Sequence, residues 1–186
     1  GLMYYDGDGV TQSYSEAIKW YKLAADQGDL DAQYLLGLIY HLGQGVTQSY
    51  SEAAKWFKLA ADQGYANAQY FLGILYSYGE GVTQSYSEAA KWYRLAADQG
   101  YADAQFALGY MYSARQGVAL DYTEAAKLFK LAADQGHAGA QNNLGKMYVE
   151  GRGVPPSDLN AIKYFRMAAD QGDPIGIKNL HMMLTK

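Results

Sequence analysis

The chain has 186 residues, of which 49% are hydrophobic and none is cysteine, and it carries a formal net charge of −4. This apolar content supports a folded core and argues against intrinsic disorder, while the missing thiols exclude thiol catalysis, disulfides and cysteine-based zinc sites. The negative charge disfavours a nucleic-acid partner, and because no apolar run reaches the roughly 18 residues of a membrane span, we expect no direct membrane insertion.

The sequence repeats itself with a period of 36 residues. The string Ala-Ala-Asp-Gln-Gly begins at the evenly spaced positions Ala24, Ala60, Ala96, Ala132 and Ala168. Residues 45–56 recur letter for letter at 81–92. Five periods and six further residues account for the whole chain. Residues 1–186 are therefore predicted to form a single array of about five units, which is cut inside the same element at both ends.

The first complete element of each repeat is a predicted amphipathic helix, which we call the B helix. Ser13 and Glu16 have the spacing of a capping box, in which each side chain satisfies the backbone N–H group of the other residue. The motif returns at 49–52, 85–88 and 121–124, and the copy at 157–160 keeps only the cap. Apolar residues three and four apart follow, and Gly28 then suits a left-handed helix end.

The second element is a predicted helix over residues 30–42 and its copies, which we call the A helix. Ala32, Leu36 and Tyr40 lie four apart and therefore share one face. Gly37 lies beside them, although a glycine inside a helix costs about 0.5–1 kcal/mol, and its recurrence in four repeats predicts close approach of a neighbouring helix backbone. The turn at 43–45 ends the helix, and its copy at 115–117 lacks the first glycine, which predicts a different turn geometry there.

These positions resemble the Sel1-like repeat (SLR) family, a relative of the tetratricopeptide repeat. The pattern is carried by Ala32, Leu36, Gly37, Tyr40, Gly43, Gly45, Val46, Ala53, Trp56, Ala60, Ala61 and Gly64. The resemblance implies an all-α fold, a right-handed superhelical solenoid of antiparallel helix pairs. It also implies a non-enzymatic scaffold or adaptor that binds a protein or peptide in its concave groove. Members of the family act in membrane-associated degradation complexes, in bacterial envelope and exopolysaccharide machinery and in bacterium–host contact, which is compatible with a periplasmic or secreted protein.

The polar residues form no recognisable motif for catalysis or metal binding. His41, His137 and His181 each stand alone in a repeat and at different positions, so we expect no metal site and no cofactor. Most carboxylates recur with the repeat, as Glu16 does, whereas an active site needs one asymmetric cluster. We therefore expect no enzyme activity. Asp26 and its copies oppose the dipole at the end of the B helix, and the sequence offers no reason for them.

The repeats differ most on one face of the A helix. At 100° per residue, positions 34, 38 and 41 lie about 180–240° from Ala32, opposite the recurring stripe. The resemblance to tetratricopeptide arrays assigns this face to the concave groove. The predicted partner-binding residues are Tyr34, Leu38, His41, Tyr70, Ile74, Phe106, Tyr110, Asn142, Lys146 and Lys178. A solvated face would be polar, whereas this face is aromatic and aliphatic through three repeats and then turns amide-rich and basic. Packing of these side chains between neighbouring A helices is the alternative.

The sequence-based prediction is thus a monomeric fragment that binds a protein or peptide partner. An apolar segment would lie along 34–110, and the basic end at Lys146 and Lys178 would favour a carboxylate. The alternative function is a small-molecule or glycan-binding module of a bacterial envelope or exopolysaccharide pathway. Residues 1–6 lack the counterparts of Ala32 and Leu36 and offer no polar outer face, which predicts further repeats upstream.

Overall fold

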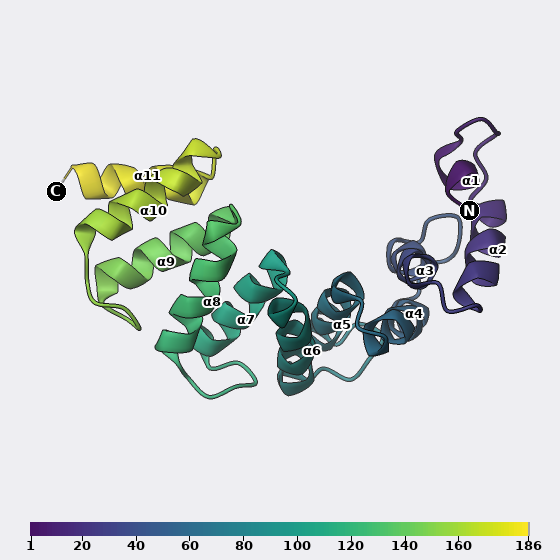
Figure 1. The fold of residues 1–186 in the computed structure, drawn as a ribbon, viewed down its shortest axis with the longest axis horizontal. Helices are drawn as coiled ribbons and strands as arrows, with labels where there is room; N and C mark the ends of the chain where they lie inside the picture. The colour runs from purple at the N-terminus through teal and green to yellow at the C-terminus, as the bar shows by residue number, and fades with distance from the viewer. Residues whose placement is uncertain (186) are drawn as a thin grey trace. The chain divides into compact units, whose positions relative to one another are not determined.

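The computed structural model describes residues 1–185, which form eleven α-helices and no β-strand (Figure 1). The A helices are α1 (Leu2–Asp6), α3 (Leu30–Leu42), α5 (Ala66–Tyr78), α7 (Ala102–Ala114), α9 (Ala138–Glu150) and α11 (Pro174–Leu184). The B helices are α2 (Tyr14–Ala25), α4 (Tyr50–Asp62), α6 (Tyr86–Asp98), α8 (Tyr122–Asp134) and α10 (Asp158–Asp170). The predicted all-α solenoid of helix pairs is confirmed, and the predicted A helix at 30–42 has the bounds of α3.

The helices group into two compact units, one from Gly1 to Trp92 and one from Tyr93 onward, with the boundary inside α6. In unit 1 each helix from α1 to α5 packs against the next, and in unit 2 the same holds from α7 to α11. The core of each unit is built from the alanines of the B helices around a fully buried phenylalanine, Phe57 in unit 1 and Phe129 in unit 2. A single array over residues 1–186 remains a prediction.

The B helices begin on the predicted caps, but only half of each capping box forms. The Ser13 hydroxyl accepts a hydrogen bond from the backbone N–H of Glu16 at 3.4 Å. The predicted reciprocal bond is wrong, because the Ser13 N–H donates to the carbonyl of Tyr4 at 2.8 Å, and the Glu16 carboxylate pairs with Lys19 at 2.6 Å. The same cap-to-carbonyl bond recurs in later repeats. The cap therefore ties each B helix to the A helix before it.

A buried glutamine in the A helix links one repeat to the next. Gln33 donates from Nε2 to the carbonyl of Ala25 at 3.1 Å, and its Oε1 accepts from Gln63 of the following repeat at 3.0 Å. Gln141 and Gln171 form the same amide pair at 2.8 Å. A buried amide without partners costs about 1–3 kcal/mol, so these paired glutamines fix the spacing between the repeats that they join.

Two of the recurring aspartates near the ends of the B helices have a partner one turn earlier. Asp62 accepts from Lys58 at 2.8 Å, and Asp134 accepts from Lys130 at 2.6 Å. Exposed pairs at this spacing contribute about 0.3–0.5 kcal/mol, which offsets the unfavourable position of the carboxylate on the helix dipole. The structure thus supplies, for the aspartates of α4 and α8, a reason that the sequence did not.

The turn after α7 keeps the geometry of its relatives, so the predicted difference at 115–117 is wrong. Arg115 has φ 56° and ψ 39°, in the left-handed region, where the equivalent Gly43 has φ 72° and ψ 30°. Its N–H donates to the carbonyl of Met111 as the N–H of Gly43 donates to that of Ile39. The helix end and the turn that follows impose the conformation even on a side chain that disfavours it.

Candidate functional site

The predicted A-helix face divides into a packed row and a more open row. The packed row comprises the first predicted position on α3, α5, α7 and α9, and it is at least half-buried at Tyr34, Tyr70, Phe106 and Asn142. The same position on α11 is Lys178, which is exposed. The Tyr34 ring lies 5.9 Å from Phe57, 5.5 Å from Tyr65 and 5.7 Å from Phe71, measured between ring centroids. Tyr70 meets the same Phe71 edge-on at 5.7 Å. Tyr34 of α3 therefore packs against α4 and α5, in agreement with the alternative interpretation for this residue.

Phe106 and Asn142 continue the packed row in unit 2. The Phe106 ring stacks on His137 with centroids 4.4 Å apart and an interplanar angle of 23°. Asn142 is only 5% exposed, and its Nδ2 donates to Asp173 Oδ1 at 2.6 Å. Asp173 Oδ1 also accepts from the N–H of Gly176 and so caps α11. Both residues hold the A helices of unit 2 in place instead of facing outward.

The open row is the second predicted position, and in unit 2 its side chains are exposed. We define it as Tyr110 on α7, Lys146 on α9 and Met182 on α11. Tyr110 and Met182 each keep 50% of their surface, and Val149, one turn after Lys146, keeps 37%. Lys178 on α11 is exposed as well. The surface that a partner of unit 2 can touch therefore runs along these three A helices.

In unit 1 the equivalent positions are more covered. Leu38 and Ile74 are half-buried, and Leu38 packs against the unit 1 core. His41 is also half-buried, with its ring 5.2 Å from that of Tyr50 and 6.2 Å from that of Phe71. The predicted groove residues of unit 1 thus contribute more to packing than those of unit 2.

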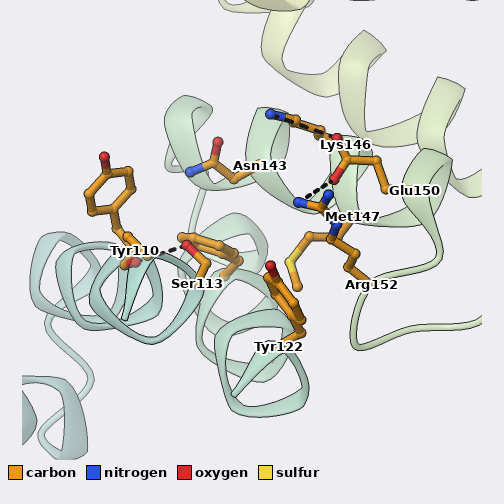
Figure 2. A pocket seen from close by; sticks show the side chains of 10 residues that line it. Tyr110, Ser113, Tyr122, Asn143, Lys146, Met147, Glu150 and Arg152 are labelled. Carbon is orange, nitrogen blue, oxygen red and sulfur yellow. Dashed lines mark hydrogen bonds and ion pairs between the residues drawn. The ribbon is translucent and has the colours of Figure 1, made fainter. Parts of the chain in front are cut away.

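A pocket of about 240 Å³ lies beside Tyr110 in unit 2. Figure 2 shows Tyr110 and Ser113 on one side of it and Lys146, Glu150 and Arg152 on the other. The Ser113 hydroxyl donates to the carbonyl of Tyr110 at 2.8 Å. The remaining lining residues are Ala114 on α7, Tyr122 and Phe129 on α8, and Asn143 and Met147 on α9.

Three charged side chains form one cluster at the rim of this pocket. Glu150 Oε2 lies 3.2 Å from Arg152 Nη1, and Glu150 Oε1 lies 3.8 Å from Lys146 Nζ. The Arg152 guanidinium also lies over the Tyr122 ring at 5.4 Å from its centroid, a cation–π contact that helps to orient it. Two cations share one carboxylate, so the cluster carries a formal charge of +1 in a chain whose net charge is −4.

A second pocket of about 240 Å³ adjoins Lys146. Its walls are mainly apolar and comprise Val149, Phe165, Asn179, Met182 and Met183. Methionine side chains adapt to ligands of varied shape. Because Lys146 lines both pockets, it lies between a polar pocket and an apolar one.

Ser113, Asn143, Glu150 and Arg152 were not among the predicted site residues. Arg152 follows α9 in a turn, where helical periodicity carries no information, and Glu150 is the last residue of α9. A signal was nevertheless present in the sequence. Positions two repeats earlier hold uncharged Tyr78 in place of Glu150 and the opposite charge, Glu80, in place of Arg152.

Among residues 1–185, no group of three or more histidine, aspartate or glutamate side chains lies close enough to hold a metal ion. None of the helices described in the structure combines the length and apolar character needed to cross a membrane.

The fold and the open A-helix face define a helical-repeat protein of the solenoid class. The Sel1 repeat model matches residues 1–29, 30–65, 66–101, 102–137 and 138–173. The chain belongs to the Sel1 repeat family, whose members are generally non-catalytic scaffolds for protein interactions.

Solved structures of similar proteins agree with this assignment. A protective antigen of uropathogenic Escherichia coli with an SLR fold is 39% identical, with a TM-score of 0.95 over 98% of this chain and 39% of that chain. A Sel1 repeat protein from Oxalobacter formigenes is 34% identical, with a TM-score of 0.87 over 96% of this chain and 71% of that chain. Helicobacter pylori cysteine-rich protein B shares the fold, at 23% identity and a TM-score of 0.55 over 69% of this chain and 92% of that chain. No curated protein matches the chain. The chain thus spans well under half the length of the E. coli protein.

Proposed function

We propose that the chain is an interaction module that binds a segment of a partner protein along the open row of unit 2. One observation carries the proposal: Tyr110, Val149 and Met182 remain 50%, 37% and 50% exposed on three successive A helices, beside two pockets. The family resemblance assigns the same face to the concave groove. The more general role, that of a non-catalytic scaffold for protein interactions, is the one that members of the family generally have.

The chemistry of the open row suits a protein segment. Tyrosine offers a large apolar ring with a polar tip, and methionine offers a flexible apolar side chain. Side chains of an extended segment would fill the pockets on either side of Lys146 while its backbone lies across the row. The segment would be bound by a single copy of the chain, because all three helices belong to unit 2. The small-molecule or glycan alternative gains no support from the comparisons.

The test is a selection of random short peptides displayed on phage against the immobilised chain. One selected peptide is then synthesised, and its affinity is measured by fluorescence polarisation for the wild type and for variants. Tyr110→Ala and Met182→Ala should each weaken binding about tenfold, as expected for central contact residues.

The matched control is Leu95→Ala, which removes a side chain of similar exposure, 46%, from the B helix α6. It should leave the affinity within about twofold. The proposal fails if no peptide is selected, or if Leu95→Ala costs as much affinity as Tyr110→Ala does.

A further inference from the structure

Two positions that line the pocket beside Tyr110 carry aromatic rings at the equivalent places of unit 1. Residues 72 positions apart are equivalent, because they lie two repeats apart. The positions of Ser113 and Asn143 are thus held in unit 1 by His41 and Phe71, whose rings lie 6.2 Å apart, centroid to centroid. A hydroxyl and a short amide take up less space than an imidazole and a phenyl ring. The small polar side chains at these two positions therefore leave more room beside Tyr110 than two aromatic rings would.

The charged cluster is also particular to unit 2. Its three members replace two uncharged residues and one acid of unit 1, with the equivalences Lys146 to Ile74, Glu150 to Tyr78 and Arg152 to Glu80. Eight of the ten lining positions differ from their unit 1 equivalents, whereas the B helices α4 and α8 differ at only two of 13 positions. The sequence change between the units thus lies mainly on the A helices, where seven of the 14 substituted positions of α7 and α9 line the pocket.

The donors around the pocket are not saturated by Glu150. The 3.8 Å between Lys146 Nζ and Glu150 Oε1 is too long for a hydrogen bond, and the Arg152 guanidinium has further N–H groups beyond the one that faces Glu150. A single carboxylate would neutralise the formal +1 of the cluster and accept charge-assisted hydrogen bonds. A phosphate group carries about −1.5 to −2 charges and would leave the cluster with a net negative charge.

We propose that this pocket binds one carboxylate of the partner segment, with Lys146 and Arg152 as donors and the Asn143 amide and Ser113 hydroxyl lining the floor. The inference rests on the proposed function, because the carboxylate belongs to the same segment that lies along the open row. An apolar residue next to the acid would enter the second pocket at Met182 and Met183. The ligand is therefore an acid-plus-apolar peptide motif, and the acid is either a side chain or a free C-terminus.

Nuclear magnetic resonance titrations of the ¹⁵N-labelled chain test the pocket without a partner. Four probes are compared. N-acetyl-glutamic acid α-amide carries a side-chain carboxylate, and N-acetyl-leucine carries a C-terminal carboxylate. N-acetyl-glutamine α-amide is the neutral probe, and N-acetyl-phosphoserine amide carries a phosphate. At least one carboxylate probe should shift the backbone amide signals of Ser113, Asn143, Lys146 and Arg152 in a saturable way. The carboxylate probe that binds more tightly shows whether the pocket prefers a side-chain or a C-terminal carboxylate. The proposal is overturned if the neutral amide binds as tightly as both carboxylates, or if the phosphate binds more tightly than either.

Two kinds of variant assign the effect to the pocket. Lys146→Gln and Arg152→Gln should each weaken the carboxylate probe about fivefold to tenfold, as the loss of a charged hydrogen-bond donor does. The matched control Lys127→Gln removes an exposed lysine of α8 that does not line this pocket and should change nothing. The double change Ser113→His and Asn143→Phe refills the pocket with the residues of unit 1 and should abolish binding while circular dichroism stays that of the wild type. Should the double variant fold poorly, the two single charge variants still decide the outcome.

The two proposals fail in different ways. If selected peptides bind along the open row but Lys146→Gln and Arg152→Gln leave them unaffected, the carboxylate site is wrong and the interaction module stands. If the carboxylate probes bind and no peptide does, the pocket is a carboxylate site and the proposed function is wrong.

Discussion

The ring of Phe165 on α10 occupies the place where a side chain on Gly145 would lie. A Cβ atom on Gly145 would stand 2.6 Å from Phe165 Cε1, and Phe165 is buried. Gly37 stands in the same relationship to the buried ring of Phe57. The predicted close approach at this recurring glycine is confirmed, but at Gly37 and Gly145 the neighbour is the aromatic ring of the next B helix instead of its backbone. Gly145, which precedes Lys146, thus allows α9 to pack closely on α10. The site residues of α9 are positioned by this packing.

Gly145→Ala should therefore destabilise the fold by up to about 2 kcal/mol. Overpacking a core costs about 1–3 kcal/mol, and the better helix propensity of alanine returns about 0.8–1.0 kcal/mol of that. The free energy of unfolding from urea titrations measures the result. Gly109→Ala is the matched control, because its Cβ would stand 3.0 Å from the Phe129 ring and needs a smaller adjustment. Equal losses at the two glycines would contradict the packing explanation.

Arg115→Gly should stabilise the chain by about 0.5–1 kcal/mol. Among residues 1–185, Arg115 is the only non-glycine residue with a positive φ, and a left-handed conformation costs an L-residue about 1–2 kcal/mol. The greater backbone entropy of unfolded glycine removes part of the gain. The reverse change at the equivalent turn, Gly151→Ala, should destabilise, because φ is 64° there and a Cβ would press on Pro156 at 3.3 Å. A melting temperature that falls in Arg115→Gly would show that the arginine side chain compensates for its backbone.

The sequence predicted the helices well because their signals are local and repeated. Ser13 and its copies mark where B helices begin, and the period of 36 residues repeats every boundary. The site was harder to predict, because Phe106 and Tyr110 lie only about 40° apart on the helix. That angle does not predict whether His137 covers Phe106 or Tyr110, because the contact depends on how the next repeat packs. Arg152 could not be found by periodicity at all, because it comes from a turn.

Tyr65→Phe should make the stability of the chain less sensitive to alkaline pH. The Tyr65 hydroxyl donates to Asp31 Oδ1 at 2.6 Å, and this hydrogen bond raises the pKa of Tyr65 from 10.0 to about 12. Because the folded pKa lies above the unfolded one, the stabilisation is complete below pH 10 and is lost as the pH rises toward 12. In urea titrations at neutral pH, the free energy of unfolding of the wild type should exceed that of Tyr65→Phe by about 1 kcal/mol. This difference should shrink as the pH rises through the alkaline range.

Asp31→Asn is the companion variant for this measurement. The asparagine oxygen can still accept the hydrogen bond, but it carries no charge to oppose the tyrosinate. Its loss of stability between pH 10 and 12 should be shallower than that of the wild type. A gap between wild type and Tyr65→Phe that stays constant across this range would show that Asp31 does not hold the proton on Tyr65.

Phe106→Ala should destabilise unit 2, whereas Tyr110→Ala one helical turn later should not. Phe106 stacks on His137, whose Nδ1 caps α9 by accepting from the N–H of Ala140 at 3.1 Å. Loss of a largely packed phenylalanine costs about 2–4 kcal/mol, while an exposed side chain costs about 0.5 kcal/mol or less. Melting temperature and carboxylate-probe affinity should both fall in Phe106→Ala, because α9 carries Lys146, and Phe106→Leu should recover part of each. Tyr110→Ala should keep the melting temperature and lose only peptide affinity. An unchanged melting temperature in Phe106→Ala would contradict the packing role and would favour the binding role that the sequence predicted for Phe106.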